Sequence, residues 1–347
     1  MKKFNTLAVC GVLSMSMAAS VLTGCGDKAV DGTQTAMVID GDEISLGMAN
    51  YVLRTEQANT YAQMQGMLAY FGGDGKSFWS LEGDDGVTYG EAFKDSTVDN
   101  LTSLVEIRKH AEEMGVSVSE EEEQKLQEAA KAFLEKNTEA MEKLGVSQEN
   151  IQEALELQTL EIKIRPEVIA NVDREVSDEE AAQTTVTYVR LAKPKDDEAA
   201  LKTAKEQMEQ VLEDVKNAKA GADLGEIGDT VNEDCYSAQY HFNQGVYDEE
   251  NNVLETAVKD VLPGLKDGEV YDKVIEGDSY LYVIRMDHNF DREKTDAQKE
   301  TIIRERENTL YTETIEGWTE GITAETKDCW NKIVVDDNDP YVLNIQG

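Results

Sequence analysis

The chain has 347 residues, of which 33 are basic and 71 acidic, and its formal net charge at pH 7 is −38. A surface of this sign repels phosphate backbones and anionic headgroups, which argues against nucleic-acid binding and against electrostatic docking on membranes. Because 40% of the residues are hydrophobic and recur at regular spacing, folded domains are expected rather than the disorder that high net charge alone would favour.

The first 25 residues have the organisation of a secretion signal. Two lysines precede a mainly apolar stretch over residues 7–22, which is short and interrupted by serines and therefore suits a signal peptide better than a membrane span. The ending Leu-Thr-Gly-Cys at 22–25 resembles the lipobox of bacterial lipoproteins, which implies removal of residues 1–24 and lipidation of Cys25. An ordinary signal peptide with a chance cysteine is the alternative. Residues 25–36 are polar and are expected to form a flexible tether.

Two cysteines remain for the folded part, Cys235 and Cys329. They could form one disulfide or stay as two buried thiols, and the low cysteine density favours thiols. No Cys/His spacing suggests zinc, and neither a metal nor a cofactor is expected.

Residues 37–175 are expected to form a helical domain. Two short strands joined by an Asp-Gly turn are predicted over 37–45. Gly115 suits a helix C-cap, and Ser119 with Glu122 resembles a capping box. Apolar spacing predicts helices over about 46–70, 89–114, 120–136, 140–144 and 148–164.

Apolar side chains around the glycine-rich stretch 72–75 are candidates for contact with other proteins. Methionine and aromatic side chains repack readily around varied apolar partners. The alternative is that they form the domain's own core, which is favoured for the helical positions. The candidate client-binding residues are Met67, Tyr70, Phe71, Phe78 and Trp79.

Residues 176–289 no longer show an all-helical pattern and are expected to form a compact α+β domain. Strands are predicted over 186–191 and 280–286, a helix over 201–215, a loop-rich stretch to about 245, and a short helix over 253–261. Over residues 290–347, the sequence predicts a helix at 297–318 and a strand at 333–335. This long terminal helix cannot fold alone, so the segment is expected to return to the helical domain.

The order of these elements resembles the PrsA-type foldase lipoproteins and the SurA-type periplasmic chaperones. The resemblance rests on Val-Ile-Asp-Gly-Asp-Glu-Ile at 38–44, on residues 111–121, and on Val-Ser-Asp-Glu-Glu at 176–180. It implies an α+β fold in which a mainly helical, SurA-N-like chaperone domain is formed by N- and C-terminal segments. A parvulin-type peptidyl-prolyl isomerase domain would be inserted between these segments.

The inserted domain departs from its relatives at the residues that carry catalysis. The family's first-strand histidine falls on Tyr188, Val189 or Arg190, and its last-strand histidine falls on Leu281 or Tyr282. Without the histidines, electrostatic stabilisation of the twisted prolyl amide is lost, so weak or absent isomerase activity is expected.

No catalytic residue is recognisable by resemblance, and three candidates remain: His241, Tyr282 and Cys235. A structural role is favoured for His241, a loop histidine flanked by aromatic residues. Cys235 is better explained as a small buried hydrophobe.

The function expected is that of a chaperone or foldase for exported proteins, lipid-anchored on the outer face of the bacterial cytoplasmic membrane. Its partners would be unfolded or newly exported proteins and, through the anchor, the membrane. Homodimerisation is left open, and no nucleic acid is expected. The alternatives are an active prolyl isomerase and a ligand-binding or envelope-assembly lipoprotein.

Overall fold

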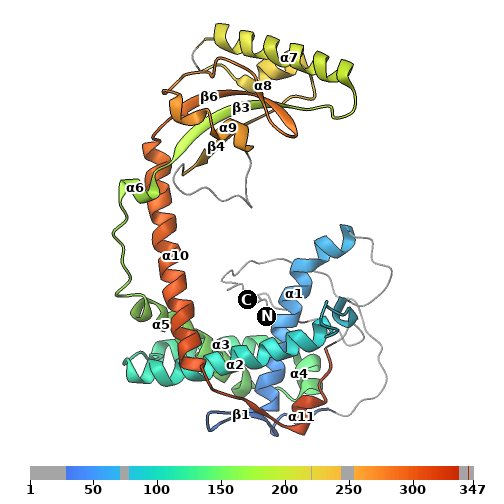
Figure 1. Ribbon diagram of the computed structural model, residues 1–347. Coiled ribbons are helices and arrows are strands. Elements are labelled where there is room, and N and C mark those ends of the chain that lie inside the picture. The colour runs from blue at the N-terminus through green and yellow to red at the C-terminus, as the bar shows by residue number, and fades with distance from the viewer. Residues whose placement is uncertain (1–28, 71–77, 220, 244–253, 336–342, 344–347) are drawn as a thin grey trace. The chain divides into compact units, whose positions relative to one another are not determined.

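The computed structural model describes residues 29–70, 78–219, 221–243, 254–335 and 343, with side chains described throughout except at 64–70 (Figure 1). The chain divides into two units. Unit 1 comprises residues 1–171 and 310–347, and unit 2 comprises residues 172–309. Helices predominate in unit 1 and both units contain antiparallel sheets, so the predicted α+β class is confirmed.

Unit 1 begins with a hairpin. β1 (Thr35–Ile39) pairs antiparallel with β2 (Asp42–Ser45), and β7 (Glu325–Thr326) pairs with the other edge of β1. Asp40 and Gly41 have φ values of 44° and 90°, the left-handed conformation that two-residue hairpin turns require. The predicted Asp-Gly turn is therefore confirmed.

The residues just before β1 are packed rather than free, which corrects the predicted length of the tether. The Val30 amide donates to the Lys143 carbonyl at 3.1 Å, and the Gly47 amide donates to the Gly32 carbonyl at 2.9 Å. A Cβ on Gly32 would lie 1.7 Å from the Gly145 carbonyl oxygen. The chain therefore already belongs to the fold at Val30, and a tether can extend only up to that point.

The helices of unit 1 follow the predicted ranges closely. Ser119 forms a capping box with Glu122, and Ser147 forms one with Asn150. Gly115 follows the second long helix with φ 72°. The helices are α1 (Leu46–Tyr70), α2 (Tyr89–Glu113), α3 (Glu120–Lys136), α4 (Thr138–Leu144) and α5 (Gln148–Val168), with the 3₁₀ turn η1 (Phe78–Ser80) and the short α11 (Asp328–Asn331).

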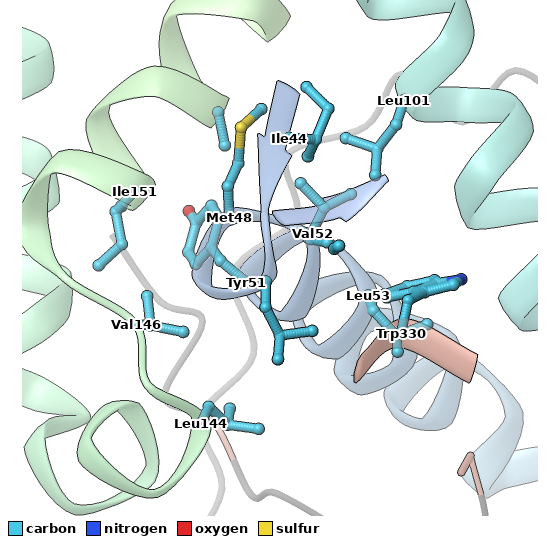
Figure 2. Packing of buried hydrophobic residues seen from close by; sticks show 14 of the residues in the cluster. Ile44, Met48, Tyr51, Val52, Leu53, Leu101, Leu144, Val146, Ile151 and Trp330 are labelled. Atoms are coloured by element: carbon cyan, nitrogen blue, oxygen red, sulfur yellow. The ribbon is translucent and has the colours of Figure 1, made fainter. Parts of the chain in front are cut away.

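The core of unit 1 joins the beginning of the chain to its end. Figure 2 shows Ile44 and Met48 packed among residues of α1, α2 and α5, with Trp330 of α11 beside Leu53. Trp330 is only 1% exposed. The C-terminal segment therefore contributes a large aromatic side chain to the core built by the N-terminal helices.

The predicted strand at 333–335 is wrong. Its carbonyls accept hydrogen bonds from basic side chains instead of from a neighbouring strand: Lys94 Nζ donates to the Ile333 carbonyl and Arg54 Nη2 to the Val334 carbonyl, both at 3.0 Å. The apolar run is explained by packing, since Ile333 and Val335 contact the unit 1 core.

Unit 2 is built on a four-stranded antiparallel sheet of order β4-β3-β6-β5. Its strands are β3 (Thr184–Ala192), β4 (Tyr236–Phe242), β5 (Ile275–Glu276) and β6 (Tyr280–His288). The stretch to about residue 245, expected to be rich in loops, in fact contains the helix α8 (Leu224–Val231) and the whole of β4.

Helices cover both faces of this sheet (Figure 1). α7 (Glu198–Asn217) and α8 (Leu224–Val231) pack on one face, whereas α9 (Thr256–Lys259) and the 3₁₀ turn η2 (Leu262–Gly264) pack on the other.

Unit 2 extends past residue 289, the predicted end of the inserted domain. The first part of α10 (Arg292–Thr319) is tied to the segment that enters the unit, which includes the short α6 (Asp178–Ala181). Arg292 pairs with Asp178 at 2.6 Å, and Arg306 pairs with Glu180 at 2.7 Å. The last part of α10 belongs to unit 1, where His110 stacks on Trp318 with ring centroids 4.1 Å apart.

Candidate functional site

One face of the unit 2 sheet is lined by aromatic rings. The strand register places the even-numbered residues of β3, β4 and β6 on the same side, because side chains alternate along a strand. Tyr188 and Tyr282 are buried there with ring centroids 6.1 Å apart, and Tyr280 lies 6.0 Å from Tyr282. Tyr236 is 53% exposed, so this end of the aromatic face is open to solvent.

Arg190 lies among these rings. Its guanidinium carbon is 4.4 Å from the ring centroid of Tyr280, 4.8 Å from that of Tyr236 and 5.9 Å from that of Tyr188. Such contacts stabilise a cation and fix its position. Within the described part of the chain the buried Nε of Arg190 makes no hydrogen bond of normal geometry, and the guanidinium acts on the Tyr282 hydroxyl as a hydrogen-bond neighbour.

Glu255 and Tyr282 complete the polar part of this face. Glu255 Oε1 accepts a hydrogen bond from the Ser279 amide at 2.9 Å. Glu255 Oε2 and the Tyr282 hydroxyl are buried and make no hydrogen bond of normal geometry within the described residues, although Arg190 lies close enough to Tyr282 to act on its hydroxyl as a hydrogen-bond neighbour. Burial, with the charge of Glu255 as a second cause, raises the pKa of Tyr282 to about 12. The hydroxyl is therefore a hydrogen-bond donor at neutral pH.

Gly277 makes room for the carboxylate. A Cβ at this position would lie 1.6 Å from Glu255 Oε2, so any side chain there would displace Glu255. Among the described residues of unit 2, the buried polar atoms Arg190 Nε, Tyr282 hydroxyl and Glu255 Oε2 thus lie on this face without a hydrogen bond of normal geometry. We call these three residues the polar trio.

The opposite face of the sheet is different because its polar groups bond to one another. Asp287 accepts hydrogen bonds from Thr187 at 2.5 Å, from Gln239 at 3.1 Å and from Arg285 Nε at 2.6 Å. A hollow of about 740 Å³ lies over this network. Its central acid is fully satisfied, so the unpaired buried side-chain atoms among the described residues of unit 2 are on the aromatic face.

The three sequence-predicted catalytic candidates do not come together. Tyr282 lies on the aromatic face. His241 is on β4 rather than in a loop, and it is exposed on the opposite face, where it pairs with Thr185. Cys235 packs in the cluster between the sheet and α8, and burial raises its pKa. A site combining these three side chains is therefore excluded.

Because side chains alternate along a strand, the structure also shows which face of the sheet each candidate position for the missing histidines occupies. Tyr188, Arg190 and Tyr282 all point to the aromatic side, where Arg190 is the direct cross-strand partner of Tyr282 and Tyr188 is a diagonal neighbour. Val189 and Leu281 point to the α7 side of the sheet, where both are buried. Among the candidate positions, the pair that lies directly opposite across the two strands is therefore Arg190 and Tyr282.

Unit 1 has a separate exposed apolar surface after η1. Leu81 is 40% exposed, Val87 38% and Tyr89 44%. Phe78 stacks on Tyr89 with ring centroids 4.9 Å apart and ring planes 10° apart. We call these four residues the apolar patch.

A tight loop fixes the patch in place. The Tyr89 amide donates to the Leu81 carbonyl at 2.9 Å, and the Gly83 amide donates to the Val87 carbonyl, also at 2.9 Å. Trp79 anchors the loop because its indole is buried in the core, 3% exposed. The patch is thus presented by a hydrogen-bonded loop with a buried base.

The predicted client-binding residues divide into three groups. Phe78 lies in the apolar patch. Trp79 is a core residue, so the expectation that it contacts clients from an exposed loop is wrong. Met67 and Tyr70 are on α1 at positions whose side chains are not described, and Phe71 lies outside the described residues, as does Cys25.

Cys235 and Cys329 are both free thiols. Cys329 Sγ donates to the Thr35 carbonyl at 3.2 Å. Among the described residues, no group of three or more His, Cys, Asp or Glu side chains could hold a metal ion, and no helix is long and apolar enough to cross a bilayer.

No family model matches the chain, and no curated protein matches it. Similar solved structures include the peptidylprolyl isomerase PrsA of Bacillus cereus, with 14% identity, a TM-score of 0.30, and coverage of 76% of this chain and 95% of that one. The foldase PrsA of Streptococcus pneumoniae has 15% identity and a TM-score of 0.29, covering 72% and 97%. A SurA-like chaperone of Campylobacter jejuni has 14% identity and a TM-score of 0.27, covering 85% and 99%.

These structures belong to the groups that the sequence motifs resemble. Because identities and TM-scores are this low, no residue role is carried over from them to this chain.

Proposed function

We propose that the protein is a lipid-anchored extracytoplasmic chaperone that holds apolar segments of unfolded, newly exported proteins. Unit 2 contributes a peptide-binding face with weak or no prolyl isomerase activity. The observation that carries the proposal is the apolar patch, in which Leu81, Val87 and Tyr89 are exposed beside the half-buried Phe78, on a chain of net charge −38.

A rigid group of exposed aromatic and aliphatic side chains favours contact with apolar partners. The hydrogen-bonded loop limits the entropy lost on binding, since the side chains are already held in place. The acidic surface would keep the chaperone and its bound client soluble through charge repulsion between complexes. The shape and the apolar contact area then determine how tightly a client binds. Such binding suits many clients rather than one.

Weak isomerase activity follows from the chemistry of the aromatic face. Rotation about a peptide bond has a barrier of about 18–20 kcal/mol, and catalysis requires groups placed to stabilise the twisted amide. Tyr188, Arg190 and Tyr282 occupy the aromatic side, and Tyr282, with a pKa of about 12, stays neutral where an imidazole would titrate.

An active prolyl isomerase is the second candidate. The observation in its favour is the cross-strand pair of Arg190 and Tyr282 on the aromatic face, whose donor groups could bind a twisted carbonyl.

Aggregation of a denatured model protein tests the client-binding proposal. Replacing Leu81, Val87 and Tyr89 together by serine should weaken suppression of aggregation at least several-fold, because the exposed apolar contact area is lost. Ile162→Ser is the matched control, since Ile162 is 71% exposed on α5 outside the patch. Unchanged suppression by the triple variant, or equal loss in the control, would show that the patch does not hold clients.

Membrane anchoring through Cys25 has its own test. In a bacterial host, the wild-type chain should be found in the membrane fraction and incorporate labelled fatty acid. Cys25→Ser should abolish both, because a single polar side chain replaces the acyl-bearing thioether. Fatty-acid labelling of the Cys25→Ser chain would contradict the assignment.

A further inference from the structure

The strand β4 lies at one edge of the unit 2 sheet, since the strand order is β4-β3-β6-β5. It pairs with β3 over all seven of its residues and without a bulge. Among the described residues, no backbone group of β4 forms a hydrogen bond on the side away from β3. Within that part of the chain, the strand therefore presents an unpaired edge.

The hydrogen-bond pattern of the sheet shows which backbone groups point outward at this edge. The Lys193 amide donates to the Ser279 carbonyl at 2.9 Å, in line with the β3–β6 register. Because hydrogen bonds alternate between the two sides of a strand, the even-numbered residues over 186–190 of β3 bond to the even-numbered residues of β4. The N–H and C=O groups of Ser237, Gln239 and His241 therefore point away from β3.

This edge lacks the features that protect most edge strands from further pairing, which are charged side chains, prolines and bulges. The strand reads Tyr-Ser-Ala-Gln-Tyr-His-Phe and contains no Asp, Glu, Lys, Arg or Pro, although 30% of the whole chain is charged. None of its seven residues is buried, and Gln239 and His241 are exposed. An accessible, uncharged and regular edge is suited to pairing with another extended backbone.

The side chains beside the edge favour an apolar partner. Tyr236 is 53% exposed. Tyr240 and Phe242 are half-buried and stack with ring centroids 5.5 Å apart and ring planes 15° apart. All three rings lie on the aromatic face, and every second side chain of an added strand would lie beside them.

Charge separates the two kinds of chain that could occupy the edge. A second copy of this protein would bring another net charge of −38, which opposes association. An unfolded client offers extended apolar segments whose backbone groups are not yet paired. The client is therefore the partner that fits.

We propose that an extended, uncharged apolar segment of a client adds to the unit 2 sheet as a further strand beside β4. Its backbone pairs with Ser237, Gln239 and His241, and its alternate side chains lie along the aromatic rings. The inference rests on the proposed chaperone function and names how unit 2 holds a client. Backbone pairing gives affinity that does not depend on a particular client sequence.

Gln239→Pro tests the edge because it removes one outward N–H and leaves the hydrogen bonds to β3 in place. Binding of a fluorescently labelled, uncharged apolar octapeptide is measured to the whole chain apart from its predicted signal peptide. The affinity should fall about three- to tenfold, as expected for one lost backbone hydrogen bond. Gln239→Ala is the matched control: it also removes the 3.1 Å side-chain hydrogen bond to Asp287, but it keeps the N–H and should bind as the wild type does.

N-methyl scanning of the same octapeptide is a second test, and it decides the matter if Gln239→Pro does not fold. The N–H groups of an added strand point alternately toward β4 and away from it. Methylation should therefore lower the affinity about tenfold at every second central position and by less than about twofold at the positions between.

The outcomes separate this inference from the function on which it rests. A methyl scan without alternation, or equal affinities of folded Gln239→Pro and Gln239→Ala, would overturn strand addition at β4 even if peptides bind and aggregation is suppressed. Dimers that Gln239→Pro dissociates in sedimentation analysis, without peptide binding by the wild type, would assign the edge to a second copy instead. Absence of binding by every peptide, together with absence of aggregation suppression, would overturn the chaperone function as well.

Discussion

Glu56 on α1 is a carboxyl group whose ionisation works against folding. Asn100 donates a hydrogen bond to one of its oxygens, and Thr97 donates to the other at 3.4 Å. Burial, with the charge of Glu161 adding to it, raises the pKa of Glu56 from 4.5 to about 7. Because the folded-state pKa is higher, the unfavourable contribution is absent below pH 4.5, grows as the pH rises towards 7, and is constant above.

Glu56→Gln should therefore stabilise the protein selectively at high pH. We expect the free energy of unfolding to rise by roughly 1–2 kcal/mol at pH 8 and to be unchanged at pH 4, since glutamine keeps an acceptor for Asn100 without the charge. Urea denaturation at both pH values measures this. Glu128→Gln, exposed on α3, is the control and should change neither value. A gain that is equal at the two pH values would contradict the burial argument.

For single residues, the sequence predicted which side chains occupy the candidate positions, but it did not predict what surrounds them in the fold. It identified Tyr188, Arg190 and Tyr282 among several positions for the missing histidines, but only the strand register shows that Arg190 lies directly opposite Tyr282. Glu255 could not be found at all, because its relation to Arg190, 65 positions away along the chain, depends on the folded sheet. Trp79 could not be assigned to the core because a glycine-rich stretch precedes it and no periodic pattern includes it.

Among the elements, α2 and the C-terminal segment are in close backbone contact. A Cβ on Gly90, in the first turn of α2, would lie 2.1 Å from the Val335 carbonyl oxygen and 3.1 Å from that of Trp79. Glycine is thus required where the helix, the loop after η1 and the chain end meet. The same contact lies next to the apolar patch, since Tyr89 is the adjacent residue.

Gly90→Ala should destabilise unit 1 even though alanine is the better helix former. We expect a loss of about 1–3 kcal/mol from the clash, against a gain of about 0.5–1 kcal/mol from helix propensity alone. Gly317→Ala in α10 is the matched control, because no atom lies within 4 Å of its added Cβ, and it should stabilise. Thermal unfolding of both variants decides the matter, and stabilisation by Gly90→Ala would refute the close approach.

Elements with strong periodicity or capping signals were predictable, and weaker ones were not. The helices α2 and α3 and the strand β6 lie where the sequence places them, because apolar spacing and a capping box define them. β4 was missed although Tyr236, Ala238, Tyr240 and Phe242 alternate at the strand period, a signal partly concealed by the polar residues between them. Residues 333–335 had strand composition, but Lys94 and Arg54 bind the carbonyls that a strand would need.

At the scale of the whole molecule, the proposed function places two candidate binding surfaces on one strongly acidic chain. The apolar patch offers exposed apolar area, and unit 2 offers aromatic rings beside the edge strand β4. The sequence indicated the two-part organisation, since a long terminal helix needs a partner. The bounds of unit 2 could not be predicted because they depend on the ion pairs of Asp178 and Glu180 with α10.

The most direct measurement follows two activities of the same purified chain: suppression of aggregation of a denatured model protein, and the cis–trans isomerisation rate of a proline-containing tetrapeptide. The account predicts suppression at near-stoichiometric chaperone, with isomerisation close to the uncatalysed rate. Rapid isomerisation that Tyr282→Phe abolishes would contradict it by showing that the aromatic face is a working isomerase site. Failure to suppress aggregation would contradict the chaperone function itself.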